Sequence, residues 1–124
     1  LSNALLDTPW FKVRHRMAAF AEALAADTGR HGNALDVARY LNLMAETREA
    51  PTGALPETGV APEWEKLLSA AFIRSPRYGT RATTVLRIRH DGCFDVTERR
   101  FDAQGQIGET RYLGALDTVT HADT

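Results

Sequence analysis

The segment Tyr78-Gly79-Thr80-Arg81 combines residue types that can bind an anion. The planar guanidinium of Arg81 matches a carboxylate or a phosphate, and Gly79 allows a ligand to approach the backbone closely. Thr80 and Thr83 add hydroxyl donors. The alternative is a tight turn that leads into a strand, with Tyr78 packed and Arg81 paired with a structural carboxylate. Taken by themselves, these residues favour the turn.

A second candidate lies near the start of the chain, at Ser2-Asn3. A neutral amide such as that of Asn3 can orient a substrate or stabilise a developing oxyanion. The alternative is again structural, because an Asn close to the entrance of a helix is commonly a turn former.

The histidines and the single cysteine do not form a metal-binding pattern. With Cys93 as the only cysteine, the chain can make no intramolecular disulfide and no cysteine-rich metal site. His90 and Cys93 flank a predicted turn, but a closed zinc site needs four ligands. A haem iron could be ligated by one His or Cys, yet no Cys-x-x-Cys-His motif is present. We expect no metal site and interpret the histidines as surface residues (His15, His31, His90 and His121).

The composition is that of one globular domain. Of the 124 residues, 44% are hydrophobic and 25% are charged, enough to bury a core. With 15 Lys plus Arg against 16 Asp plus Glu the net charge is -1, so no global field attracts nucleic acid or an anionic membrane. No apolar run is long enough for a membrane span, and the start does not resemble a signal peptide. We therefore expect a cytoplasmic protein with no membrane span.

Positive charge is concentrated locally between Arg74 and Arg100, where seven arginines face three acidic residues. Such an excess can bind an anion or an acidic partner. Arg87 and Arg89 alternate in a strand pattern, however, which is typical of a solvated or edge face. No row of aromatic residues lies between them for base stacking, so we expect no nucleic-acid partner.

The first half of the chain predicts helices. Thr8 can cap a helix whose first position is Pro9, and an apolar stripe facing the core follows with helical spacing (Trp10, Val13, Met17, Phe20 and Leu24). A second helix is expected after a cap at Asn33, with an apolar side drawn from Leu35, Val37, Ala38, Leu41 and Met44. Residues 47–62 hold too many Pro and Gly for a regular element. A third helix is expected from Pro62 to about Ala71, with Trp64, Leu67 and Leu68 facing inward.

The second half predicts a β-meander. We expect a short strand at Phe72-Ile73, a strand over 81–90, a type I′ turn at Asp91-Gly92, a strand over 93–101 and a third strand near 109–113. Residues 1–71 would then be mainly helical, residues 72–113 a meander and residues 114–124 a tail, in a single domain or the C-terminal portion of a larger one.

This α+β pattern implies helices packed on one face of an antiparallel sheet. In a simple hairpin register, Leu86 and Ile88 lie on one face, and Val85, Phe94 and Val96 lie on the other. Both faces of the sheet then need other elements packed against them, although the helices of this chain can cover one face at most. The shortage indicates that part of the fold is missing.

Three segments carry a family resemblance: LSNALLDTPW at 1–10, LPETGVAPEWEKLLSAAFI at 55–73 and YGTRATTVLRIRHDGCFDVTERRFD at 78–102. Together they resemble the C-terminal half of the NRDE family, also called the Transport and Golgi organisation family. The resemblance implies half of a four-layer αββα sandwich like that of the N-terminal nucleophile hydrolases. It raises the weight of a ligand-binding role for Asn3, Tyr78, Thr80 and Arg81.

The activity implied by this resemblance is hydrolysis of an amide bond. The family's proposed nucleophile is an N-terminal cysteine, which would lie on an absent N-terminal half. Leu1 cannot replace it, and Cys93 sits inside a strand pattern. We therefore assign no catalytic residue and expect the chain to be inactive alone. The alternative is a non-catalytic protein that binds haem or another small metabolite, with Arg81 holding an anionic group. Expected partners are the missing N-terminal half or a second copy bound through the uncovered sheet.

Overall fold

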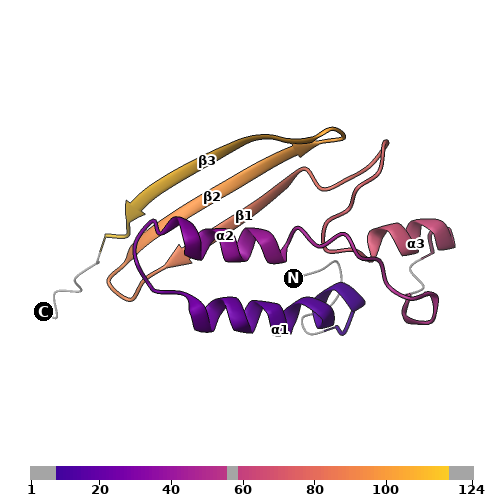
Figure 1. Ribbon diagram of the computed structural model, residues 1–124, viewed down its shortest axis with the longest axis horizontal. Helices are drawn as coiled ribbons and strands as arrows, with labels where there is room; N and C mark the ends of the chain where they lie inside the picture. Colours follow the sequence, from indigo (N-terminus) through magenta and orange to yellow (C-terminus); the bar gives the residue numbers. More distant parts are fainter. Residues whose placement is uncertain (1–7, 56–58, 118–124) are drawn as a thin grey trace, which may run out of the picture.

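The computed structural model describes residues 8–55 and 59–117. Within them the chain forms three α-helices, a 3-10 helix and a three-stranded antiparallel sheet (Figure 1). In chain order the elements are α1 (Phe11–Ala26), α2 (Ala34–Leu43), η1 (Thr52–Ala54), α3 (Pro62–Leu68), β1 (Ala82–Ile88), β2 (Cys93–Asp102) and β3 (Gly105–Ala115). Helices precede strands, so the predicted α+β class is confirmed. None of the helices in these two ranges has both the length and the hydropathy needed to cross a bilayer.

The sheet is a meander with strand order β1-β2-β3. The hairpin between β1 and β2 occurs where it was predicted, but its turn is not the two-residue type I′ turn. The Arg89 N–H donates to Cys93 O (2.8 Å) and the Gly92 N–H donates to Arg89 O (3.0 Å), so three residues form the loop. Gly92 has φ +83°, the left-handed conformation that ends such a loop. The third strand is also longer than the predicted 109–113.

This extra loop residue reverses the predicted faces of β2. Leu86 pairs with Val96, and Ile88 pairs with Phe94. Directly opposite residues share a face, so these four apolar side chains lie together on the side of the sheet away from the helices. The prediction that placed Phe94 and Val96 with Val85 is wrong, because a one-residue change of register moves every side chain to the other face.

The hydrophobic core lies between the helices and the other face of the sheet. Its buried residues come from α1, α2 and β1 (Ala23, Val37, Tyr40, Leu41, Leu43 and Val85). The predicted Asn33 cap is confirmed, because its side-chain oxygen accepts a hydrogen bond of 3.0 Å from the Asp36 N–H. Leu35, placed on the apolar side of this helix by the sequence pattern, is 71% exposed. The buried side of α2 therefore runs through Val37 and Leu41.

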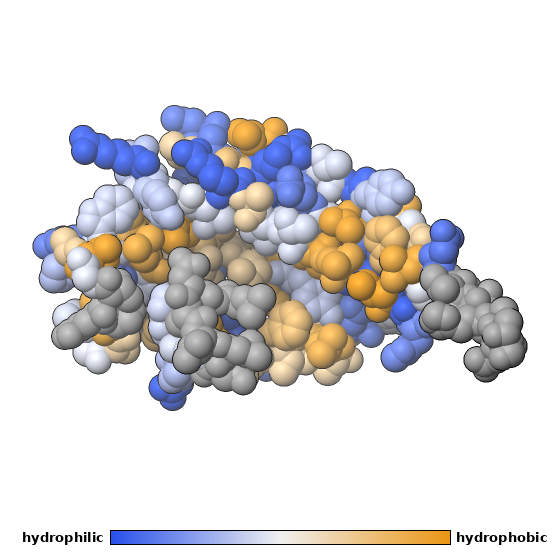
Figure 2. Space-filling view, turned by 180° about the vertical axis from the view of Figure 1, so that it is seen from behind, coloured by the Kyte–Doolittle hydropathy of each residue, from blue (hydrophilic) through white to orange (hydrophobic). Residues whose placement is uncertain are grey.

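Helix α1 begins two residues later than predicted and does not bury its apolar stripe. It starts at Phe11 with no side-chain cap. Met17, Phe20 and Leu24 are at least half exposed, whereas Ala23 is buried. The helix contacts the rest of the core through its small residues, so the prediction of a core-facing stripe is wrong for these three side chains. Figure 2 shows hydrophobic side chains reaching the surface in separate groups on one face of the molecule.

The segment between α2 and β1 has little regular structure beyond η1 and α3. Helix α3 ends at Leu68, three residues before the predicted end, and Trp64 is exposed instead of facing inward. No strand forms at Phe72-Ile73. A single bridge between Arg74 and Gly79 closes a turn there instead.

The prediction that Arg87 lies on a solvated face is wrong, since its side chain is only 10% exposed and lies among three carboxylates. Its guanidinium nitrogens lie 2.7 Å from Asp27, 3.1 Å from Asp36 and 2.9 Å from Asp95. We call these four residues the Arg87 cluster. Asp36 and Asp95 are fully or almost fully buried. The Tyr40 hydroxyl also donates to Asp27 (2.9 Å). The cluster joins the end of α1, helix α2 and the first two strands.

Candidate functional site

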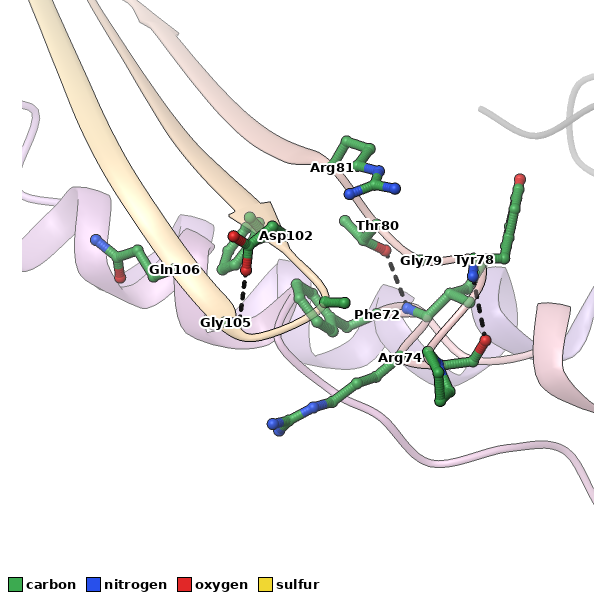
Figure 3. A pocket seen from close by; sticks show the side chains of 14 residues that line it. Phe72, Arg74, Tyr78, Gly79, Thr80, Arg81, Asp102, Gly105 and Gln106 are labelled. Carbon is green, nitrogen blue, oxygen red and sulfur yellow. Dashed lines mark hydrogen bonds between the residues drawn. The ribbon is translucent and has the colours of Figure 1, made fainter.

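The segment before β1 and the turn between β2 and β3 enclose a hollow of about 230 Å³ (Figure 3). We call it the 72–81 pocket. The residues that line it come from both segments and include Phe72, Arg74, Tyr78, Gly79, Thr80, Arg81, Phe101, Asp102 and Gln106. A backbone hydrogen bond of 2.8 Å from the Phe101 N–H to Arg81 O holds the two segments together. The pocket thus depends on residues about 20 positions apart in the sequence, brought together by the β1–β2 pairing.

A pair of hydrogen bonds between Ile73 and Thr80 shapes the turn that carries the pocket. The Thr80 N–H donates to Ile73 O (2.8 Å), and the Ile73 N–H donates to the Thr80 hydroxyl oxygen (2.9 Å). The Tyr78 N–H donates to the Ser75 hydroxyl oxygen (3.3 Å). The Thr80 hydroxyl therefore has a structural partner, and its remaining donor capacity is one O–H.

Gly79 is required by close backbone packing inside this turn. A Cβ atom at this position would lie 2.9 Å from Ile73 O, the same oxygen that accepts the Thr80 N–H. We expect Gly79→Ala to lower the free energy of unfolding by about 1–3 kcal/mol, because the backbone must shift to relieve the overlap. Urea denaturation measures the change.

Gly53→Ala is the matched control for this substitution. A Cβ atom at Gly53 would meet nothing within 4 Å, so the control variant should unfold like the unmodified protein. Equal stability of the Gly79→Ala and Gly53→Ala variants would show that the turn adapts without cost.

Aromatic side chains form the apolar part of the pocket. Phe72 and Phe101 meet edge to face, with ring centroids 4.7 Å apart. Tyr78 makes a similar contact with Trp64 at 5.8 Å and remains 49% exposed. Such edge-on pairs are favourable arrangements of aromatic rings. The predicted packing of Tyr78 is therefore present, and Figure 3 shows its ring pointing away from Phe72.

The charged groups of the pocket are two arginines and one carboxylate. Asp102 accepts hydrogen bonds from the backbone N–H groups of Gln104 (2.7 Å) and Gly105 (3.1 Å) and so closes the β2–β3 turn. Within residues 8–55 and 59–117, Arg74 and Arg81 form no ion pair. Figure 3 shows the Arg81 guanidinium beside Thr80, while the Arg74 side chain extends in the opposite direction, below the β2–β3 turn. Two solvated cations thus border one aromatic hollow.

The structure brings together three of the four residues that the sequence singled out. Tyr78, Thr80 and Arg81 line the pocket, whereas Asn3 lies outside the described residues. The sequence reasoning missed Phe72 and Phe101 as pocket residues. Phe72 was assigned to a strand, and no local pattern connects Phe101 with a turn that ends some 20 residues earlier. Arg74 was noticed only as part of the local excess of arginine.

The remaining candidates for chemistry have different surroundings. Desolvation, and then hydrogen bonding to Asp91, raise the pKa of the Cys93 thiol, which disfavours the reactive thiolate. His90 is exposed beside the same hairpin. In the part of the chain that the structure describes, no three His, Cys, Asp or Glu side chains are placed to hold a metal ion.

The fold and the pocket define an α+β domain with a basic, aromatic-walled hollow at one end of its sheet. The family model for Transport and Golgi organisation 2 matches residues 1–103, so the chain belongs to that family. The "Transport and Golgi organization protein 2 homolog" of Homo sapiens is 34% identical over 102 residues, which are 80% of this chain and 37% of the human protein. The bovine homologue is 37% identical over 103 residues, with the same shares covered. The chain thus spans little more than a third of the length of these relatives.

Proposed function

We propose that this chain binds a small anionic molecule in the 72–81 pocket. The observation that carries the proposal is the position of Arg74 and Arg81 beside the Phe72–Phe101 pair. A guanidinium that is not already paired with a protein carboxylate can form two charge-assisted hydrogen bonds to a carboxylate or phosphate. The aromatic rings offer an apolar surface to the body of the same molecule.

The size of the pocket favours a compact ligand. Its volume of about 230 Å³ lies below the range of about 300–1,000 Å³ that is usual for drug-sized ligands. We therefore favour a small organic acid or phosphate over haem. Haem binding is the alternative that the family resemblance implies.

Titration of the protein with benzoate, succinate and inorganic phosphate tests this proposal. We expect at least one of these anions to cause saturable shifts of the amide resonances in the 72–81 pocket. Arg81→Met should weaken that binding by about tenfold or more, since a hydrogen bond to a charged group contributes roughly 1.5–3 kcal/mol.

Arg77→Met is the matched control, because Arg77 is an exposed arginine of the same turn that does not line the pocket. It removes the same charge and should leave binding within about twofold, the effect of weak long-range charge at moderate salt. Absence of saturable shifts with all three anions would overturn the proposal, as would equal weakening by the two substitutions.

Amide-bond hydrolysis, the activity that the resemblance implies, is the second proposal, and it would use the same pocket to hold the substrate. The nucleophile would then come from residues beyond these 124. The raised pKa of the Cys93 thiol supports this division, because a thiol kept protonated is a poor nucleophile. In that role Arg81 and Tyr78 would position the substrate and would not take part in bond breaking.

A further inference from the structure

Among residues 8–55 and 59–117, no segment pairs with the outer edge of β1, so this edge is open to a further strand. The odd-numbered residues of β1 make the backbone hydrogen bonds to β2. At its two ends, the Arg89 N–H donates to Cys93 O and the Phe101 N–H donates to Arg81 O. In an antiparallel ladder the even-numbered residues then direct their N–H and C=O groups outward. These are Ala82, Thr84, Leu86 and Ile88. Natural edge strands are usually blocked by charges, bulges or prolines, and these four residues supply none.

Helix α1 extends past this open edge. In Figure 1, α2 lies along β1, and α1 lies on the far side of α2 from the sheet, beyond the edge of β1. Between α1, α2 and β1 is a hollow of about 570 Å³. Its apolar walls include the stripe of α1 that the core does not cover, Phe20 (50% exposed) and Leu24 (59%), together with Val85, the apolar residue of β1 that faces the helices.

The charged groups that border this hollow, Asp27 and Arg87, are already paired. Asp27 accepts hydrogen bonds from Arg87, Tyr40 and the Gly29 N–H. Arg87 is engaged by all three carboxylates of its cluster. An occupant therefore gains little from the charged side chains here. It can gain backbone hydrogen bonds from β1 and apolar contact with α1, which is the pattern of recognition by strand addition.

A second copy of this chain fits this edge poorly. If two β1 strands paired antiparallel about a twofold axis, the partner's α2 would lie on its own β1, on the same side of the joined sheet. That is the space over which α1 of the first copy already extends. The geometry favours an extended segment with no helix covering it on this side.

We propose that the groove between α1 and the open edge of β1 binds an extended β-strand from the part of a family-length protein that lies outside the matched region. The human and bovine relatives supply that length, because this chain covers 37% of each. The strand pairs with Ala82–Ile88 through the backbone and places alternate apolar side chains under Phe20 and Leu24.

The test uses synthetic peptides of about 12 residues, long enough for one strand, that tile the unmatched part of the human relative. Each peptide is added to the ¹⁵N-labelled chain, and amide hydrogen exchange is followed. We expect one or more peptides of alternating apolar sequence to slow exchange at Thr84 and Leu86 at least tenfold, because outward N–H groups become bonded.

Two variants should abolish this protection. Thr84→Pro removes an outward N–H without removing a backbone hydrogen bond to β2, and Leu24→Asp puts a charge on the exposed apolar face of α1. Glu109→Pro is the matched control, a proline at an outward position of the opposite edge, on β3, and should retain the protection. The proposal is overturned if no peptide protects these amides, if Thr84→Pro leaves protection intact, or if protection appears without peptide and rises with protein concentration, the sign of a second copy.

Discussion

Replacement of Arg87 by Leu is expected to lower the free energy of unfolding by about 3–5 kcal/mol, the usual cost of removing one partner from a buried ion pair. The side chain of Arg87 is only 10% exposed and is the cation shared by three carboxylates. Without it, Asp95 remains buried with no cation beside it, and Asp36 keeps only the partly exposed Arg39, at 2.8 Å. Urea denaturation at neutral pH measures the difference.

Arg89→Leu is the control for this prediction, two residues further along the same strand pattern. Arg89 pairs with Asp91 at 3.0 Å, but the two side chains are 41% and 50% exposed. Exposed pairs contribute about 0–1 kcal/mol, so the control should lose little stability. Similar losses in the two variants would contradict the structural role given to the Arg87 cluster.

The loss of stability caused by Arg87→Leu should depend on pH. Hydrogen bonding to Arg87 holds the pKa of Asp27 well below its usual range. A lowered folded-state pKa means that the stabilisation is present above the unfolded pKa of about 3.9 and is lost as the pH falls below it. The unmodified protein should therefore lose stability below about pH 4, whereas the deficit of the Arg87→Leu variant should shrink there.

Tyr40 should make the protein sensitive to alkaline pH. Burial, and then hydrogen bonding to Asp27, raise the pKa of the Tyr40 hydroxyl to about 12. A raised folded-state pKa means that the stabilisation is complete below the unfolded pKa of about 10 and is lost as the pH rises toward the folded value. At about 1.4 kcal/mol per pKa unit, a rise of about two units corresponds to a loss of about 3 kcal/mol.

Urea denaturation between pH 9 and 12, values that bracket the free tyrosine pKa, tests this expectation. Tyr40→Phe should lower stability at neutral pH and flatten its dependence on alkaline pH. Tyr112→Phe, at a residue that is 63% exposed, should keep the dependence of the unmodified protein. A flat profile in the unmodified protein would exclude the Tyr40–Asp27 hydrogen bond as a source of stability.

Features determined by neighbouring residues could be predicted from the sequence. Asn33 was identified as a helix cap because capping needs only a suitable side chain next to a helical segment. The position of the first hairpin followed from Asp91-Gly92 for a similar reason. The exact loop length did not, since one dipeptide is compatible with two-residue and three-residue loops. That single residue decided which face Phe94 and Val96 occupy.

Features determined by distant residues could not be predicted. The alternation of polar and apolar residues around Arg87 is the same whether the arginine is solvated or enclosed. The carboxylate partner of Arg87, Asp27, lies 60 residues away in the sequence. The spacing of Phe20 and Leu24 correctly predicts one apolar face on α1 but does not show what covers it. In the candidate site, the local motif led to Tyr78, Thr80 and Arg81, whereas Phe101 joins them only through strand pairing.

The separation in sequence between the members of the Arg87 cluster also bears on how the chain folds. The three strands follow one another through short turns, so the meander closes only short loops as it forms. Contacts from Asp27 and Asp36 to Arg87 close loops of 60 and 51 residues, at a larger cost in chain entropy. We therefore expect the sheet to form early and the ion pairs to form late. In that order, the cluster mainly slows the unfolding of the protein and does little to speed its folding.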